Sequence, residues 1–255
     1  MTSVCLIGAG NVGQQFYQAF KKSQIAKVTQ WYNRTKSSIS SFENEVTVTD
    51  EISQLTEADL YILAVTDDQI SEISKTLPFS DRLVVHTCGA VNIHDLDKKN
   101  RRGVFYPLQT FSKSKIMDFE NVPLCIEALD KNDYILLKSI ATSLHSPVYK
   151  ISSEQRLTLH LSAVFINNFS NHLYRISHEI SDAKQINFDL LKPLIQETAN
   201  KIQHMSPYLA QTGPGIRNDK KTIKKHLKLI EKPLYKDLYE LLTKSIKNTH
   251  GIKKL

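Results

Sequence analysis

The stretch Val4-Cys5-Leu6-Ile7-Gly8-Ala9-Gly10-Asn11-Val12-Gly13 decides the fold of this chain. Four apolar residues with the composition of a buried strand lead into a G-x-G-x-x-G turn, and a helical pattern follows. In that context Gly8 permits the tight turn, Gly10 lets the backbone approach a pyrophosphate, and Gly13 allows close packing of helix on strand. We therefore predict that residues 8–13 bind a dinucleotide at a helix N-terminus. A glycine-rich turn without a ligand is the alternative.

Short apolar runs, rich in Val, Ile, Leu and Tyr, recur over the first 150 residues. Several are apolar throughout, as strands are when crossover helices cover both faces of a parallel sheet. The spacing between runs leaves room for a helix or a long loop. The pattern predicts an α/β fold with a doubly wound sheet, whose strands are expected at residues 3–7, 27–32, 45–48, 60–65, 82–86, 103–106 and 122–127.

The pattern changes after Lys150. Ser152 and Gln155 have the spacing of a capping box, and no Gly or Pro interrupts the helical pattern that continues to about residue 180. Pro193 lies near the start of a second helix or kinks it. We predict an α/β domain at residues 1–150 and an all-helical domain at 151–255. Further helices are expected at residues 188–204, 219–231 and 233–247, with a loop at 206–218.

Composition excludes several classes of protein. The 255 residues are 41% apolar and 23% charged, as in an ordinary globular protein. No apolar run approaches the length of a membrane helix, and Met1-Thr2-Ser3 has no basic leader, so neither a membrane partner nor a secretory signal is expected. Cys5, Cys88 and Cys125 are too scattered for a zinc site or a disulfide framework. We expect no metal and a cytoplasmic location.

The net charge of +7 belongs to the end of the chain, because residues 1–216 carry a net charge of −1 and residues 217–255 a net charge of +8. Within 219–231, apolar residues follow helical spacing and lysines lie mostly on the other faces, which predicts an amphipathic helix with a basic outer face. We interpret that face as solvated, with an anion or nucleic-acid site as the alternative. No aromatic residues interleave with the lysines, so nucleic acid is not an expected partner.

The end of the second predicted strand bears on which dinucleotide is bound. An NAD site usually carries Asp or Glu there, to bind the ribose 2′-hydroxyl. This strand ends in Asn33, Arg34 and Thr35, with no acid. Arg34 can pair with a 2′-phosphate and stack on adenine, while Asn33 and Thr35 can bond phosphate oxygens. The sequence therefore favours NADP(H), with a polar turn as the alternative.

The carboxyl ends of the other strands are expected to line the cofactor crevice. They carry small and polar residues that suit contact with ribose and nicotinamide. We take Val65, Thr66, Asp67 and Thr87 as cofactor candidates and Gln109 as a substrate candidate.

Together these motifs resemble those of bacterial Rossmann-type NADP oxidoreductases. The resemblance is carried by GAGNVG at 8–13, YNRT at 32–35, LAVTDDQI at 63–70, VVHTCGA at 84–90 and YPLQTF at 106–111. The second half resembles the branch with a helical C-terminal domain of unknown function, through Thr212-Gly213-Pro214, Arg217, Asp219, Thr222 and His226. This branch is similar to pyrroline-5-carboxylate reductase, ketopantoate reductase and the 3-hydroxyacid dehydrogenases.

The resemblance implies hydride transfer at a cleft between the domains, in a homodimer formed through the C-terminal helices. The chain departs from the pattern in two places. The group usually has Arg-Gly-Asp where this chain has Arg217-Asn218-Asp219. The hydroxyacid dehydrogenases use a helix Lys followed four residues later by Asn, but the long helix here has His160 followed by Val164. Their mechanism therefore does not carry over.

Reduction of a carbonyl or imine needs a proton donor as well as a hydride. On the long predicted helix, His160, Asn167 and Asn171 share one face, and His86 ends a strand. We take His160, Asn167 and His86 as catalytic candidates. The alternatives are a polar helix edge or a dimer seam for the first two, and a histidine bonded inside the cleft wall for His86.

Arg217, Asp219, Thr222 and His226 form a second group, which we take as candidates for binding substrate. Arg217 beside a helix N-terminus suits a carboxylate, and Thr222 and His226 are neighbours on one helix face. A capped loop–helix junction is the alternative. The predicted function is NADP(H)-dependent hydride transfer to or from a small anionic carbonyl, hydroxy or imine compound. A non-catalytic NADP(H)-binding sensor or regulator is the alternative.

Overall fold

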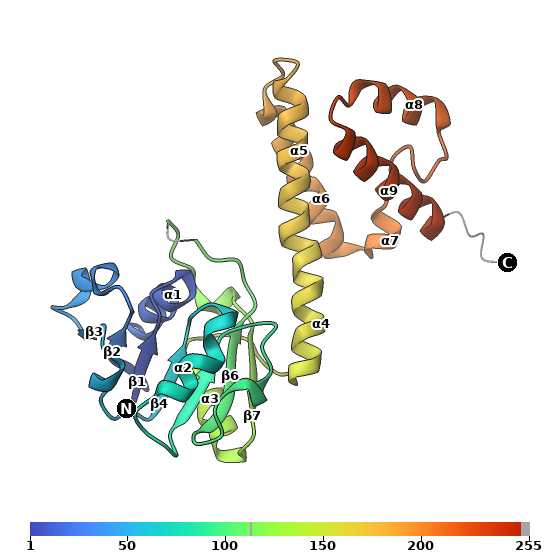
Figure 1. Ribbon diagram of the computed structural model, residues 1–255. Helices are drawn as coiled ribbons and strands as arrows, with labels where there is room; N and C mark the ends of the chain where they lie inside the picture. Colours follow the sequence, from blue (N-terminus) through green and yellow to red (C-terminus); the bar gives the residue numbers. More distant parts are fainter. Residues whose placement is uncertain (113, 251–255) are drawn as a thin grey trace. The chain divides into compact units, whose positions relative to one another are not determined.

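The computed structural model describes residues 1–112 and 114–250. Contacts divide the chain into two compact units, Met1–Asn167 and Asn168–Leu255 (Figure 1). The first unit is built on an eight-stranded sheet, and the described elements of the second unit are helical. None of the helices in the described ranges combines the length and apolar character needed to span a bilayer.

The sheet has the order β3-β2-β1-β4-β5-β6-β7-β8. The first six strands in this order are parallel, whereas β7 runs antiparallel to β6 and β8 runs parallel to β7. The predicted doubly wound α/β fold is therefore confirmed, with a mixed edge. The strands are β1 (Thr2–Ile7), β2 (Ala26–Tyr32), β3 (Thr47–Thr49), β4 (Leu60–Leu63), β5 (Leu83–His86), β6 (Arg101–Pro107), β7 (Leu124–Ala128) and β8 (Val148–Lys150).

Strand β1 is buried on both faces, as its unbroken apolar sequence predicts. Leu6 joins one core cluster with Phe16 of α1 (Asn11–Phe20) and Leu137 of α3 (Lys131–Ser143). Ile7 joins a second cluster with Ile70 of α2 (Ile70–Thr76) on the opposite face. Short 3-10 turns connect the other elements, at Lys36–Ser38, Ser40–Phe42, Ile52–Gln54, Asp67–Gln69, Ile93–Asp95 and Phe119–Asn121.

Helix α4 (Ser153–Ala163) starts with the predicted capping box, in which Ser152 and Gln155 bond reciprocally. It continues through a π-helical segment, Val164–Phe169, into α5 (Ser170–Asp182). The expected single helix is therefore interrupted by a π turn. The division by contacts falls after Asn167, whereas the expected domain boundary was at residue 150, and Arg156 of α4 is fully buried against the sheet.

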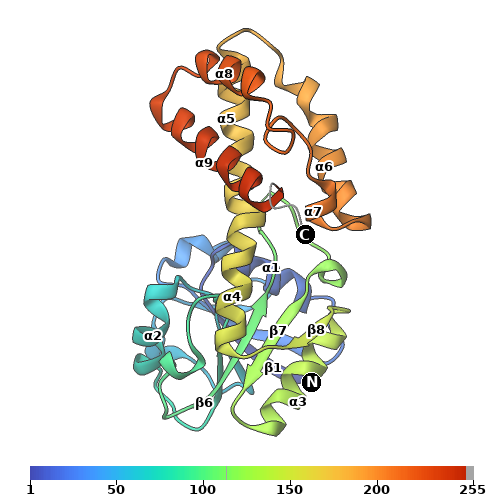
Figure 2. The same cartoon turned by 90° about the vertical axis from the view of Figure 1, so that its right-hand side faces the viewer.

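The second unit follows most of the predicted helices. Its helices after α5 are α6 (Lys192–His204), α7 (Pro207–Ala210), α8 (Lys220–Leu229) and α9 (Pro233–His250), with a 3-10 turn at Phe188–Leu191 before α6. The loop expected at 206–218 contains the short α7, and Pro193 lies in the first turn of α6. Glu179 of α5 accepts hydrogen bonds from Lys232 at 2.7 Å and Tyr235 at 2.6 Å, which joins α5 to the start of α9. Figure 2 shows the backbones of both helices.

Candidate dinucleotide pocket and its histidine edge

A pocket of about 700 Å³ lies at the carboxyl ends of β1, β2, β4 and β5. Strand β1 has β2 on one side and β4 on the other, so the pocket lies where the strand order reverses. Open α/β sheets bind ligands at this switch point. Eleven predicted cofactor residues line the pocket: Gly8, Ala9, Gly10, Asn11, Val12, Asn33, Arg34, Val65, Thr66, Asp67 and Thr87. Gly13 and Thr35 do not line it.

The glycine-rich turn has the geometry that a pyrophosphate requires. Gly8 has a φ of +109°, and a Cβ there would lie 2.3 Å from the Ala64 carbonyl oxygen. A Cβ on Gly13 would lie 2.3 Å from the Gly8 carbonyl oxygen, so only glycine permits this approach of α1 to the turn. By contrast, a Cβ on Gly10 would meet no atom within 4 Å. Gly10 therefore leaves open space beside the turn, into which a phosphate can fit.

The start of α1 offers backbone N–H groups to this space. Gly10 is the N-cap residue and makes no side-chain capping bond. The first N–H that bonds within the helix is that of Gln14, at 3.1 Å from the Gly10 carbonyl oxygen. The N–H groups of Asn11 and Val12 precede this bond, as at any helix N-terminus, and both residues line the pocket. Such groups and the helix dipole favour an anion.

Asn33 supports the turn through its side chain. Its Oδ1 accepts a bond from the Ala9 N–H at 3.0 Å, and its Nδ2 donates to the Thr35 carbonyl at 2.9 Å. Trp31 adds a bond from its indole N–H to the Gly8 carbonyl, also at 2.9 Å. Asn33 thus shapes the pocket by fixing the backbone that lines it.

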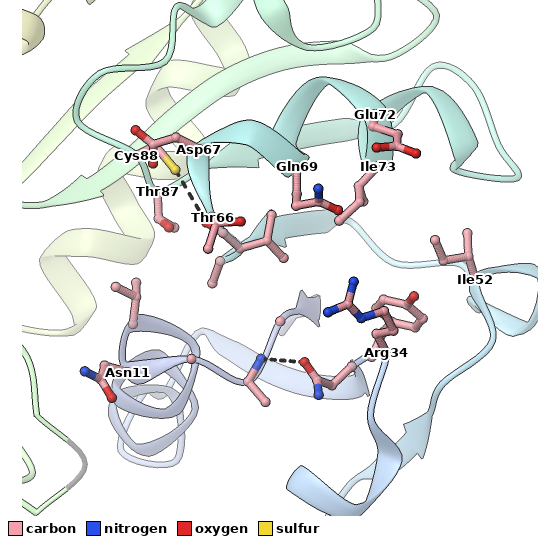
Figure 3. A pocket seen from close by; sticks show the side chains of 18 of the residues that line it. Asn11, Arg34, Ile52, Thr66, Asp67, Gln69, Glu72, Ile73, Thr87 and Cys88 are labelled. Carbon is pink, nitrogen blue, oxygen red and sulfur yellow. Dashed lines mark hydrogen bonds between the residues drawn. The ribbon is translucent and has the colours of Figure 1, made fainter.

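Arg34 is exposed and extends into the space between the glycine turn and the segment that carries Gln69 and Ile73 (Figure 3). No ion pair among the described residues includes Arg34. The nearby Lys36, by contrast, forms an ion pair in which its Nζ lies 3.4 Å from Glu43 Oε1. The guanidinium charge at the pocket is therefore available to an anionic ligand.

The opposite wall of the pocket carries small polar groups (Figure 3). Thr87 donates its hydroxyl to the Leu63 carbonyl at 3.3 Å, and the Cys88 thiol lies 3.6 Å from the Val65 carbonyl. Burial, reinforced by the neighbouring Asp67, raises the pKa of Cys88. This thiol is therefore an inert part of the wall.

His86 is fully buried and does not line the pocket. Its Nδ1 accepts a bond from the Cys88 N–H at 3.2 Å, while its Nε2 has no hydrogen-bond partner among the described residues. Burial lowers the pKa of His86 to about 3, and the charge on Arg156 acts in the same direction. The structure therefore favours the alternative for His86, a neutral histidine inside the wall.

His160 lies at the edge of the pocket. Its ring is so close to Gly89, a pocket residue, that a Cβ there would lie 2.5 Å from His160 Nδ1. The same Nδ1 is 3.3 Å from the hydroxyl of Tyr106, the second-last residue of β6. Burial raises the pKa of Tyr106 to about 12. Tyr106 was not among the predicted site residues, although its place at a strand end was a usable signal.

The remaining candidates lie elsewhere. Asn167 is exposed in the π-helical segment, where α-helical spacing from His160 no longer applies. Gln109 is exposed, and its side chain accepts a bond from the Thr110 N–H at 2.9 Å, outside the pocket lining.

The second predicted group is mainly a helix start. Asp219 is the N-cap residue of α8 and accepts bonds from the Thr222 N–H at 3.0 Å and the Thr222 hydroxyl at 2.6 Å. His226 Nδ1 is 2.8 Å from the Tyr239 hydroxyl, which joins α8 to α9. Arg217 is exposed. Asn218 has a φ of +52°, which Asn tolerates, so the left-handed backbone survives without glycine.

A switch-point pocket with a glycine-rich turn defines a Rossmann-type dinucleotide-binding protein. Residues 3–88 match the family described as NADP oxidoreductase, coenzyme F420-dependent, and residues 122–246 match a domain family of unknown function. A solved structure from Bacteroides fragilis, provisionally named an NADP oxidoreductase, is 38% identical, covers 97% of this chain and 98% of its own, and has a TM-score of 0.88. The chain belongs to this family of NADP oxidoreductases. Membership confirms the predicted class and cofactor.

More distant structures share the fold. A Thermotoga maritima protein is 19% identical over 97% of this chain and 98% of its own, with a TM-score of 0.75. A reductive aminase from Aspergillus terreus, solved with NADPH and ethyl levulinate, is 11% identical over 98% of this chain and 95% of its own, with a TM-score of 0.70. No curated protein matches the chain.

Proposed function

We propose that this NADP oxidoreductase transfers a hydride between NADP(H) and a small anionic carbonyl, imine or hydroxy compound. The observation that carries the proposal is the make-up of one pocket. It has an anion-binding turn and Arg34 on one side, and Gly89 with the adjoining His160–Tyr106 pair at its edge. A binding protein has no need of the second feature.

The residues present fit the cofactor. The N–H groups at the start of α1 would hold the pyrophosphate, Arg34 the 2′-phosphate, and Thr66 and Thr87 the nicotinamide end. The bound nicotinamide supplies or accepts the hydride. Asp67 lines the same wall.

Tyr106 and His160 provide the proton that must accompany each hydride. Burial raises the pKa of Tyr106 to about 12, so its hydroxyl stays protonated even in alkaline solution and is present as a donor. A buried phenolate is unfavourable, so His160 Nδ1, at 3.3 Å, returns a proton to Tyr106. As His160 Nδ1 passes its proton to Tyr106, Nε2 takes one from solvent, so the histidine stays neutral and the substrate gains one hydride and one proton.

Structural neighbours and one exposed arginine bear on the substrate class. Imine reductases and a reductive aminase share the fold, which favours carbonyl and imine compounds. For an anionic group on the substrate, Arg217 stays the prediction from the sequence.

We also propose that the protein is a cytoplasmic homodimer. Leu157, Leu161 and Ile166 are 51%, 57% and 74% exposed on α4 and the π segment. Leu157 and Leu161 share one helix face, so they form an apolar stripe that a second copy of the chain would cover.

A screen of keto acids and cyclic imines for NADPH oxidation tests the proposal. Tyr106→Phe and His160→Gln should each lower kcat roughly a hundredfold or more, because general acid catalysis is lost. Tyr149→Phe, at an exposed tyrosine on β8, is the matched control and should leave kcat unchanged. Tight NADPH binding with no turnover across the panel would favour the sensor instead.

A further inference from the structure

We propose that Arg156 is a positioning residue, whose buried guanidinium clamps α4 to the turn after β5 and thereby holds His160 against Tyr106. The inference rests on the proposed proton delivery by that pair. Arg156 itself does not line the pocket and touches neither His160 nor Tyr106 through any hydrogen bond in the described residues.

The contacts of Arg156 join α4 to three parts of the sheet unit. Its Nε donates to the Cys88 carbonyl at 3.2 Å, and a second nitrogen donates to the Val91 carbonyl. A third nitrogen bonds the Glu127 carboxylate of β7 at 2.7 Å. Arg156 is completely buried, so each of these bonds is made without competition from water.

The same network fixes the start of α4. Ser153 donates its hydroxyl to Glu127 at 2.7 Å and accepts the Ile93 N–H at 3.0 Å. Arg156 also bonds the Ser153 hydroxyl at 3.1 Å. The first turn of α4 is therefore tied to β7 and to the segment after β5.

The turn after β5 is held from two sides. His86 Nδ1 accepts the Cys88 N–H, and Arg156 binds the carbonyl of the same residue. Gly89 follows directly and faces the His160 ring, which leaves no room for a Cβ. Buried His86, which takes no direct part at the pocket, thus helps to fix the surface on which His160 rests.

The position of Arg156 on α4 determines the position of His160 through the geometry of the helix. Arg156 and His160 are four residues apart, so they project from the same face of α4 in successive turns. A shift of the helix by about 1 Å would break the 3.3 Å contact with Tyr106, and misplacement of that size costs roughly a hundredfold in rate.

The test compares Arg156→Met, Arg156→Lys and Glu127→Gln in the full chain. Arg101→Met is the matched control, because Arg101 forms an ion pair with the buried carboxylate of Asp133 in the same unit and does not line the pocket. The readout is the NMR signal of the His160 imidazole nitrogens, assigned by its loss in His160→Gln. Tyr106→Phe gives the signal of a His160 that has lost its partner.

We expect Arg156→Met and Glu127→Gln to move the His160 signal to the position seen in Tyr106→Phe. Arg156→Lys should move the His160 signal less, because a lysine can bond Glu127 but cannot also bond the carbonyls of both Cys88 and Val91. Affinity for NADPH should stay within about twofold, while kcat falls roughly a hundredfold. Arg101→Met should change neither the signal nor kcat.

An unchanged His160 signal in folded Arg156→Met would overturn the inference. If that variant does not fold, Glu127→Gln, which keeps the shape of the carboxylate, decides in its place. A moved signal together with full turnover by Tyr106→Phe would support the clamp and overturn the proposed proton delivery, so the two failures are distinguishable.

Discussion

Asn33 occupies the position where an NAD site would carry an acid, and its amide fixes the backbone at Ala9. Arg34, the next residue, brings a guanidinium charge to the pocket. Cofactor choice and turn geometry are therefore set by adjacent side chains. The sequence predicted the cofactor because both signals are local, but it did not show that the Asn33 side chain serves the turn.

Replacing Arg34 tests the basis of cofactor choice. Arg34→Ala should weaken NADPH binding roughly ten- to a hundredfold, because charge-assisted hydrogen bonds to the 2′-phosphate are lost. It should weaken NADH binding far less, because NADH loses only the stacking of Arg34 on adenine. Fluorescence titration with both cofactors measures this. Lys36→Ala is the control, since Lys36 does not line the pocket. Equal losses for the two cofactors would contradict the role of Arg34.

The two glycines of the turn should respond differently to a methyl group. Gly10→Ala should leave Tm unchanged without cofactor, because its Cβ meets no protein atom, yet it should abolish tight NADPH binding. Gly8→Ala should lower Tm, because Gly8 has a positive φ and its Cβ would clash with Ala64. Thermal unfolding with and without NADPH distinguishes them. If NADPH raised the Tm of Gly10→Ala as much as that of the wild type, the phosphate would not bind beside Gly10.

His86 should make the protein sensitive to acid. Its pKa is about 3 in the folded state against 6.5 for the free side chain, so the unfolded state takes up a proton first as pH falls. Above pH 6.5, His86 does not change the free energy of unfolding. As pH falls from 6.5 to 3, proton uptake by the unfolded state lowers that free energy, by roughly 4–5 kcal/mol at most. Urea unfolding of His86→Gln across this range should show a flatter pH dependence. An unchanged slope would mean that His86 is charged in the fold.

At the scale of elements, helix starts followed local sequence closely. The box at Ser152 and the cap at Asp219 both form, because each needs only a side chain and the backbone two or three residues away. The three-residue strand β8 and the antiparallel direction of β7 were not predicted. The existence of β8 and the direction of β7 both depend on the neighbouring strand in the sheet. A short apolar run of sequence does not specify its neighbour.

The site was predictable to the same extent. Residues at strand ends reached the pocket because parallel strands end at one edge. His86 satisfied this rule and was nevertheless buried, since Arg156, far along the chain, brings α4 over the same turn. The π-helical segment that contains Asn167 has no Gly or Pro to mark it. The burial of His86 was therefore not predictable from local sequence, because it depends on contacts between distant residues.

Variants of Asp219 separate capping from substrate binding. Asp219→Asn should keep Tm, because Asn is an equally good N-cap, whereas Asp219→Ala should lower it by a few degrees. If the carboxylate also contacts substrate, Asp219→Asn would raise KM at unchanged stability. Equal Tm values for wild type, Asn and Ala would contradict the cap.

For the whole molecule, the apolar stripe on α4 predicts self-association. Leu161→Lys should shift the protein from dimer to monomer in sedimentation equilibrium, because a charge would then be buried in the interface. Ile135→Lys, at an equally exposed position on α3, is the control and should remain a dimer. A Leu161→Lys variant that still dimerises would place the interface elsewhere.

The three cysteines have a practical consequence for labelling. All are buried and free, and burial raises the pKa of Cys5 to about 12, that of Cys125 to about 11 and that of Cys88 as well. Maleimides and disulfide reagents attack the thiolate, so the native thiols should remain almost silent in the folded protein. A single cysteine introduced on an exposed face would then accept a fluorophore selectively, and the wild-type chain would serve as its own labelling background.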